Sequence, residues 1–302
     1  MTAASKWVLG ILGILVALSL LVIGFSFLLY LGSSRDDGYV SAFGEKIAVI
    51  ELKGVITSSE DVVKQFKKYR DNRSIKAIVF RVDSPGGAVV PSQEIYEEVR
   101  KTREARKPVI VSMGSLAASG GYYVSCGATK IVANRGTLTG SIGVISQFIQ
   151  LDQLLNKIGI SSATVKSGKF KDSGSPLRKF SEEDKKYWEE LIQDTYKQFL
   201  TVVERERQIP HEKLLAIADG RVYSGEQAHE LGLVDTLGTY EDAIRIASDL
   251  VGIRGEPTIV KMRERRRTGF LDLLLSSAKE NMLDAKRELL DQDMLQYKLP
   301  YP

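Results

Sequence analysis

Apolar runs of strand length alternate with amphipathic stretches of helix length along most of the chain. The β-branched run KIAVIELKGVI at residues 46–56 predicts a strand. The run IKAIVFRVDSPGG at 75–87 predicts another, stopped by a Pro-Gly-Gly turn. A polar, helix-like stretch at 58–72 separates them. Strands that alternate with helices are typical of parallel βαβ units, so we expect an α/β fold with its chemistry at the strand ends.

The same alternation continues downstream. The pattern predicts an amphipathic helix over 92–106 and a strand over 107–113, which leads into the small residues GSLAASGG. A short strand and a glycine-punctuated turn follow at 130–146. Residues 151–180 predict a helix, a strand and then a basic loop. Residues 181–207 open with a capping-box signature and predict one long helix, whose role we interpret as structural.

Four parts can be distinguished along the chain. We expect a membrane anchor over residues 1–32, a polar linker over 33–44, a catalytic domain over 45–255, and a basic and then amphipathic helical tail over 256–302. Near the end of the catalytic domain, residues 219–252 predict a helix, a short strand and another helix.

The anchor is predicted from residues 7–32, which contain no charged residue. At about 1.5 Å per residue, this segment is long enough to cross a hydrocarbon core of about 30 Å as one transmembrane helix. A cleaved signal peptide has an apolar core of only about 7 to 15 residues, so an uncleaved anchor is the better interpretation. The amino terminus and Lys6 precede the segment, which predicts a cytoplasmic amino terminus and an extracytoplasmic catalytic domain.

Composition narrows the possible chemistry. The chain has 42 basic and 38 acidic residues and a net charge of +4, which gives no general case for nucleic acid as a partner. Cys126 is the single cysteine, so no disulfide forms within the chain and no Cys-rich metal site is expected. Two histidines argue against a His-based zinc site. We therefore expect neither a metal nor a cofactor.

The segment SMGSLAASGGYYVS at residues 112–125 places an unhindered serine, Ser119, where a strand should meet a helix. Small neighbours leave its hydroxyl free, and a helix start offers unpaired N–H groups, which suits a nucleophile that must stabilise an oxyanion. The alternative, favoured by the local sequence alone, is that AASGG only permits close helix packing. The DSPGG motif at 83–87 favours the nucleophile, because its glycine N–H groups could face Ser119 across neighbouring strand ends.

A serine nucleophile needs a base. His211 and His229 lie in charged, helical contexts far from both motifs and are interpreted as surface or helix residues. A lysine can serve when burial or a neighbouring cation lowers its pKa. The loop VKSGKFKDSGSP offers Lys166, Lys169 and Lys171, although a solvated basic loop is the more economical interpretation of this stretch alone.

Five motifs, taken together and in this order, favour the catalytic interpretation of the serine and the lysine. They are RVDSPGG, MGSLAASGGYYVS, GTLTGSIGV, KSGKFKDSGSP and DGRVYSGEQAHELGLVD. Behind an amino-terminal anchor, this combination resembles the short, single-repeat form of the signal peptide peptidase A family. The resemblance covers roughly residues 45–250. It implies a membrane-anchored serine peptidase with a Ser/Lys dyad, on a Clp protease/crotonase-like α/β core of repeated ββα and βαβ units.

The resemblance also implies roles for individual residues. Ser119 matches the nucleophile, Lys171 the general base, and Ser141 the position that orients the lysine. The oxyanion hole matches Gly86, Gly87 and Gly120. Expected substrates are remnant signal peptides and other short unfolded peptides, with small or aliphatic side chains next to the scissile bond. The family's single-repeat members assemble into homo-oligomeric rings with dyads made across neighbours.

Two other functions remain open at this point. A crotonase-like acyl-CoA enzyme would share the paired oxyanion donors but needs neither a membrane anchor nor a serine at position 119. A catalytically silent membrane scaffold would use the fold only for oligomerisation. Cys126 is interpreted as a small buried hydrophobe rather than a nucleophile.

The tail allows two interpretations. Residues 270–275 form a short apolar run followed by small residues, as in a signal peptide, so the enzyme could bind or trim its own tail. An amphipathic helix that packs on a neighbouring subunit is the favoured alternative.

Overall fold

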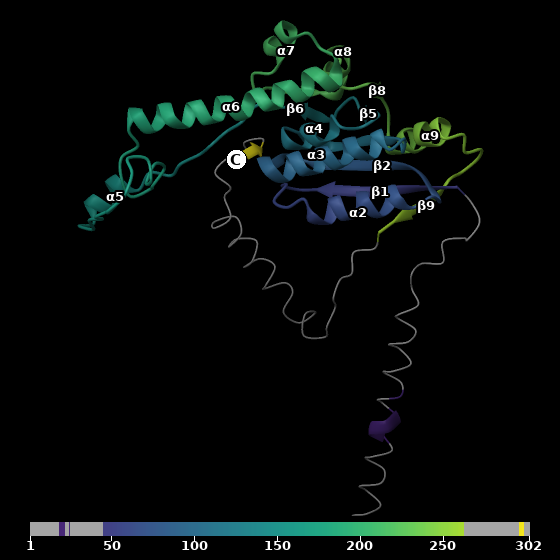
Figure 1. Ribbon diagram of the computed structural model, residues 1–302, viewed down its shortest axis with the longest axis horizontal. Coiled ribbons are helices and arrows are strands. Elements are labelled where there is room, and N and C mark those ends of the chain that lie inside the picture. The colour runs from purple at the N-terminus through teal and green to yellow at the C-terminus, as the bar shows by residue number, and fades with distance from the viewer. Residues whose placement is uncertain (1–17, 22–23, 25–44, 263–295, 299–302) are drawn as a thin grey trace, which may run out of the picture. The chain divides into compact units, whose positions relative to one another are not determined.

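The computed structural model describes residues 18–21, 24, 45–262 and 296–298. Contacts divide the chain into residues 1–44 and 45–302, and the second unit holds the α/β fold (Figure 1). Its elements follow in the order β1 (Lys46–Lys53), α2 (Glu60–Asp71), β2 (Ile75–Ser84), β3 (Gly86–Ala88), α3 (Val89–Glu104), β4 (Val109–Ala118), α4 (Gly120–Ser125), β5 (Lys130–Ala133), β6 (Leu138–Gly140), α5 (Asp152–Lys157), α6 (Glu182–Arg207), α7 (His211–Ile217), β7 (Val222–Ser224), α8 (Gly225–Glu230), β8 (Thr236–Leu237), α9 (Tyr240–Leu250), β9 (Thr258–Lys261) and β10 (Gln296–Lys298).

An eight-stranded sheet forms the centre of this unit. Its main path runs β7-β6-β4-β2-β1-β9, with β5 beside β4 and β8 beside β5. The pairs are parallel except for β6 and β7. Parallel neighbours need a crossover, and α2 and α3 supply it between the first strands. The predicted α/β class is confirmed.

Helices cover both faces of the sheet, which explains why the strands are almost continuously apolar. Side chains alternate along β1: Ile47 and Val49 belong to the cluster that packs on α9. Ile50 belongs to the larger cluster with α2, α3, α4 and α6. In that larger cluster, the rings of Phe66 and Phe80 meet edge to face, with centroids 5.1 Å apart.

Three predictions about strands need correction. β4 does not stop at residue 113 but continues to Ala118, because residues 116–118 pair with β6, a strand too short to show a pattern. The strand expected within 151–180 is wrong, since α5 is the one regular element that the structure describes there. The short strands β3, β6, β7, β9 and β10 were not predicted.

Most of the predicted anchor and tail lies outside the described residues. Of the segment 7–32, residues 18–21 and 24 are described and are helical. Within the described part of the chain, no helix combines the length and apolar character needed to cross a bilayer. The apolar run at 270–275 also lies outside the described residues, whereas 296–298 form β10.

Candidate active site

Ser119 lies between β4 and α4, at the carboxyl end of a central strand. Its backbone has φ 55° and ψ −118°, a conformation that costs a residue with a side chain about 1–3 kcal/mol. Its N–H donates to the carbonyl of Gly140 (2.8 Å), and its carbonyl accepts from the N–H of Tyr123 (2.8 Å). These bonds hold a strained, almost fully buried residue at the strand-to-helix turn.

Ser141 holds the matching position on the neighbouring strand. The parallel strands β4 and β6 pair Ala118 with Gly140, so Ser119 and Ser141 are the first residues after paired strand ends. Ser141 also has a positive φ, 50°, and its N–H donates to the carbonyl of Arg221 (2.8 Å). The structure therefore places the two serines side by side at one end of the sheet.

The glycines of the DSPGG motif lie beside the start of α4. Cα atoms of β3 approach those of α4 to within 8 Å. The carbonyl oxygen of Ser84 would lie 2.7 Å from a Cβ on Gly121, so this approach requires glycine. Gly86, Gly87 and Gly120 therefore come from the two chain segments that meet next to Ser119.

Gly86 and Gly87 are engaged differently. The N–H of Gly86 donates to Ser84 Oγ (3.1 Å), so this donor is already paired. The carbonyl of Gly86 accepts from the N–H of Ile56 (2.9 Å), and the N–H of Ala88 donates to the carbonyl of Ile56 (2.7 Å). Because N–H groups alternate in direction along an extended strand, the N–H of Gly87 points to the opposite edge of β3. Gly87 is thus the better placed oxyanion donor.

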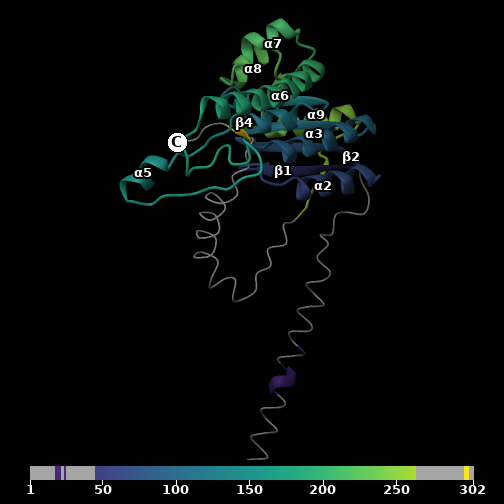
Figure 2. The ribbon, with the colours of Figure 1, turned by 60° about the vertical axis from the view of Figure 1, so that its left-hand side comes forward.

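Lys171 lies elsewhere. It belongs to the segment 144–180, which Figures 1 and 2 both show extending beyond the sheet with α5 in its outer part. Its side chain is exposed and makes no hydrogen bond or ion pair with another described residue, whereas its backbone N–H donates to the carbonyl of Gly168 (3.2 Å). The other two candidate lysines are paired: Lys166 with Asp172 (2.5 Å) and Lys169 with Glu183 (2.7 Å). The structure does not bring Lys171 Nζ into hydrogen bonding with Ser119 Oγ within one chain.

An arginine clamp fixes the backbone around Lys171. Arg178 donates to both carboxylate oxygens of Asp184 (2.5 and 2.9 Å) and to Asp172 Oδ1 (3.1 Å). Asp172 follows Lys171 directly, and Asp184 lies in the first turn of α6, where it completes a capping box with Ser181. Arg178 therefore ties the neighbour of the candidate base to the rigid end of a long helix.

Aromatic packing reinforces this attachment. Trp188 Nε1 of α6 donates to Ser173 Oγ (2.9 Å), and the Trp188 ring lies 4.8 Å from that of Phe148. A Cβ on Gly174, whose φ is 87°, would lie 2.6 Å from Phe148. The loop with Lys171 is thus anchored at Asp172, Ser173 and Gly174 although the lysine itself is exposed.

Charge interactions in the clamp keep both aspartates ionised. Hydrogen bonds from Lys166 and then Arg178 lower the pKa of Asp172 below its ordinary value. Arg178, ahead of the Ser181 backbone N–H, holds the pKa of Asp184 well below its usual range. Both groups remain charged at the pH values at which a lysine base would work.

The other candidates have structural explanations. Burial raises the pKa of the Cys126 thiol to about 12, and the residue is 2% exposed, which confirms its interpretation as a buried hydrophobe. His211 pairs with Glu204 (3.2 Å), and a ring nitrogen of His229 lies 3.2 Å from the carbonyl of Val234. In the described ranges, no group of His, Cys, Asp and Glu side chains is arranged to hold a metal.

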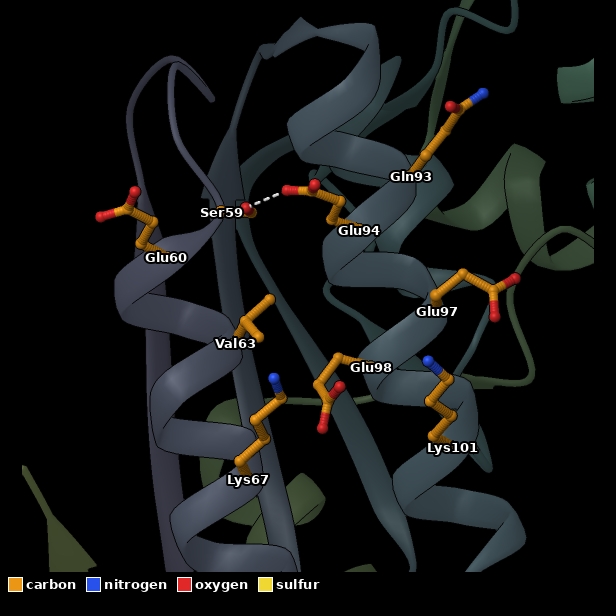
Figure 3. Close-up of a pocket in the computed structure, with 9 residues that line it drawn as sticks. All are labelled: Ser59, Glu60, Val63, Lys67, Gln93, Glu94, Glu97, Glu98 and Lys101. Carbon is orange, nitrogen blue, oxygen red and sulfur yellow. Dashed lines mark hydrogen bonds between the residues drawn. The ribbon is translucent and has the colours of Figure 1, made fainter.

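A cavity of about 480 Å³ between α2 and α3 lies outside this constellation (Figure 3). Ser59 Oγ donates to Glu94 at its edge, and Glu98 is paired with Arg70. None of the candidate catalytic residues lines the cavity. Glu94, Glu97 and Glu98 are paired with neighbours, and we assign the cavity no part in the chemistry.

Sequence reasoning missed Ser84 and Arg178. A serine two residues before a glycine N–H is a recognisable turn signal, so DSPGG contained the information for Ser84. Arg178 had no such signal, because its role depends on bringing Asp172 and Asp184 together through the fold. Taken together, the site offers a strained serine, a glycine backbone close to it and a lysine on an anchored loop, which suits acyl transfer.

Two family models match the chain. The model for Peptidase family S49 matches residues 101–254, which include Ser119, Ser141 and Lys171. The model for Clp protease matches residues 33–161, which include β1 to β6. The mixed α/β core is therefore Clp protease-like.

Several individual proteins are similar to this chain. A candidate protease of Synechocystis sp. is 44% identical over 69% of this chain and 76% of its own length. A candidate signal peptide peptidase, SppA, of Enterococcus faecium is 38% identical over 67% of this chain and 63% of its own length. A solved structure of a ClpP1 mutant from Listeria monocytogenes aligns with TM-score 0.44 and 16% identity, covering 65% of this chain and 93% of its own.

The clamp predicts the effect of Arg178→Gln. Releasing Asp172 from α6 lets the Lys171 loop shift, and a misplacement of about 1 Å lowers kcat by about a hundredfold. Peptidase kinetics of the purified full-length protein measure this. Lys169→Gln is the matched control, because its exposed pair with Glu183 contributes little. Equal activity in both variants would show that Arg178 does not position the Lys171 loop.

The clamp also predicts acid sensitivity. The pKa of Asp184 is lower in the folded than in the unfolded protein, so its contribution to stability is complete above about pH 4 and is lost as the pH falls further. Protease protection of the 165–180 loop should therefore drop between about pH 4 and pH 2. In the Asp184→Asn variant, the loop should be cleaved faster at pH 7, and its protection should fall less on acidification. The Glu183→Gln variant should behave as the parent protein. An identical acid profile in Asp184→Asn and the parent contradicts the assignment.

Proposed function

The chain belongs to Peptidase family S49 and is a serine peptidase, and from this premise we propose that it is a membrane-anchored, signal peptide peptidase A-like enzyme with Ser119 as nucleophile and Lys171 as general base. One observation carries the proposal: Ser119 lies, strained and fixed by backbone bonds, where the ends of β2, β4 and β6 meet. A serine at a strained strand-to-helix turn presents its oxygen towards a substrate rather than towards its own chain.

The proposed reaction is acyl transfer. Ser119 Oγ attacks the scissile carbonyl while a neutral Lys171 amine accepts its proton, and the resulting ammonium protonates the leaving amine. Water, activated by the same lysine, then releases the acyl group and restores the serine. The N–H groups of Gly87 and Gly120 stabilise the oxyanion. Gly86 supports them by closing the turn through its bond to Ser84.

Ser141 completes the proposed site as the residue that orients the lysine. It follows β6 as Ser119 follows β4, so a lysine that reaches one hydroxyl also reaches the other. The reaction needs neither a metal nor a cofactor.

We further propose that the dyad forms between copies of the chain. Two observations support this: Lys171 makes no hydrogen bond to Ser119 among the described residues, and its segment exposes apolar side chains. Exposed fractions of 41% to 63% are found for Ile149, Leu154, Ile158, Ile160 and Phe170. Apolar side chains gathered on one exposed segment are typical of an interaction surface. A homo-oligomeric ring would cover them and supply a lysine to each serine.

The membrane anchor and the substrate remain part of the proposal. The uncharged segment at residues 7–32 supports a single membrane-spanning helix with an extracytoplasmic catalytic domain. The name of the Enterococcus faecium relative supports remnant signal peptides as substrates. Such peptides are released at a membrane, where an anchored enzyme meets them.

Membership of a peptidase family favours peptide hydrolysis over acyl-CoA chemistry and over a silent scaffold. Labelling of Ser119 by a fluorophosphonate separates the peptidase from both.

The dyad predicts that Ser119→Ala and Lys171→Ala each lower kcat/KM by at least about a thousandfold. The two residues act as a unit, so the double variant should be little worse than either single one. Digestion of a synthetic signal peptide followed by mass spectrometry measures the rates, and circular dichroism checks the fold. Lys169→Ala, which removes an exposed lysine of the same loop that does not contact Asp172, is the control. A folded Lys171→Ala protein that keeps substantial activity rules out the dyad.

A dyad between copies predicts complementation. Mixed oligomers of the Ser119→Ala and Lys171→Ala proteins should regain part of the activity, because some interfaces join an intact serine to an intact lysine. Refolding or co-expression of differently tagged variants, followed by tandem purification, yields such oligomers. Mixed oligomers with no recovered activity would place both members of the dyad in the same chain.

A further inference from the structure

Strand β4 contains a bulge shortly before it reaches the candidate nucleophile. Val82 of the neighbouring strand β2 pairs with Met113 of β4. Two residues later along β2, Ser84 pairs with Ala117. A single residue of β2 therefore lies opposite three residues of β4, those at positions 114–116. Bulges bend the strand that carries them and are common beside active sites, where they re-aim a side chain.

The bulge is also the point at which β4 changes partners on its other edge. Before the bulge, residues 110–112 pair with β5, and after it, residues 116–118 pair with β6. Ser119 follows the second half of β4 directly, and Ser141 follows β6. The geometry of the bulge therefore fixes the direction in which β4 leads to Ser119 and the register in which it meets β6.

Asp83, the β2 residue opposite the bulge, holds it from one side. Asp83 Oδ1 accepts a hydrogen bond from the N–H of Leu116 (3.1 Å). A Cβ on Gly114 would lie 2.6 Å from Asp83 Cγ, so the carboxylate packs directly on the backbone of the bulge. An ordinary ladder would supply a main-chain acceptor to each N–H, but the extra residues of a bulge interrupt the ladder. The Asp83 carboxylate takes the place of that acceptor.

Two other side chains bind the carbonyls at the start of the bulge. Arg81 Nη1 of β2 donates to the carbonyl of Met113 (2.8 Å). From the opposite edge, Thr137 Oγ1 donates to the carbonyl of Gly114 (2.8 Å). Thr137 is 1% exposed and directly precedes β6. The bulge is therefore held by β2 and by the start of β6 at the same time.

We propose that Asp83 is a positioning residue of the peptidase reaction: by accepting from the bulge, it sets the direction in which β4 places Ser119 beside the oxyanion donors. This inference rests on the proposed function in one respect, the use of Ser119 as nucleophile. Asp83 acts on the reaction only through the backbone of residues 114–116. A misplacement of about 1 Å at a reacting group costs about a hundredfold in rate, so a hydrogen bond that shapes the end of β4 affects catalysis.

The contacts of the bulge supply matched pairs of variants. Asp83→Ala removes the acceptor, whereas Asp83→Asn keeps an amide oxygen that can accept from the same N–H. Thr137→Val removes the donor on the other edge with little change in size, and Thr137→Ser keeps a hydroxyl there. Glu51→Ala is the control, because it removes a carboxylate of the adjacent strand β1 that pairs with exposed lysines.

The first experiment measures hydrolysis of a synthetic signal peptide and the rate of fluorophosphonate labelling at Ser119, both in the full-length protein. Asp83→Ala should lower kcat and the labelling rate about a hundredfold and change KM less than about threefold, because the nucleophile rather than the bound peptide is displaced. Thr137→Val should lower kcat in the same way. Asp83→Asn and Thr137→Ser should restore kcat to within about threefold of the parent, and Glu51→Ala should keep the parental value.

The outcomes separate this inference from the proposed function. A parent protein that is not labelled at Ser119 overturns the proposed function, and this inference with it. A labelled parent whose kcat is matched by Asp83→Ala overturns the role of Asp83 alone. Equal losses in Asp83→Ala and Asp83→Asn also overturn it, because the hydrogen-bond acceptor is then not what matters.

The second experiment needs no catalysis. In the full-length protein, hydrogen exchange at the Leu116 amide should become at least several-fold faster with Asp83→Ala and should stay near the parental rate with Asp83→Asn. The amides of residues 110–112, in the first half of β4, should keep the parental rate in both variants. Parental exchange at Leu116 in Asp83→Ala overturns the contact, and faster exchange along all of β4 means unfolding rather than positioning. Faster exchange at Leu116 with the parental kcat means that the bulge does not position Ser119.

Discussion

The site depends on two backbones that come too close for any side chain between them. The start of α4 meets the end of β2 where Ser84 and Gly121 touch, and a Cβ on Gly121 would lie 2.7 Å from the Ser84 carbonyl oxygen. On the other side of the same turn, a Cβ on Gly87 would overlap the backbone of Ile56. Glycine at both positions lets Ser119, the proposed oxyanion donors and the edge of β3 occupy one small volume. A methyl group at either position would force them apart.

Backbone strain at Ser119, the candidate nucleophile, is the second consequence of this packing. Ser119 and Ser141 both have positive φ angles, and each would relax if its strand could end elsewhere. The register of β4 against β6 prevents this, and the hydroxyl of Thr139, which donates to the Ala117 carbonyl (2.7 Å), locks that register. The cost of the strained turns is offset by the well-paired, buried strands behind them. Preorganisation of the site is thus a property of the sheet rather than of the loop.

The sequence predicted the parts of the site that depend on local chemistry. Ser119 could be found because small residues and paired glycines follow an apolar strand, and DSPGG could be placed beside it because parallel strands end together. Arg178 could not be found, since its partners Asp172 and Asp184 become neighbours only when the loop folds back onto α6. β6 and β10 have three residues each, too few for a periodic pattern, and they are strands only because a partner strand is present.

Helix α6 has a geometric role that its sequence alone does not reveal. Near its carboxyl end, Glu206 accepts from the Tyr96 hydroxyl (2.6 Å) and from Arg103 (2.8 Å), which fixes the helix to α3. At its amino end, Asp184 holds the loop of Lys171 through Arg178. The 26 residues of α6 span about 39 Å at 1.5 Å each, so the length of the helix sets the distance between α3 and the loop of Lys171. Inserting one residue would shift its outer end by about 1.5 Å and turn it by about 100°. A change in the length of α6 would therefore move the loop that carries Lys171 relative to the sheet that carries Ser119.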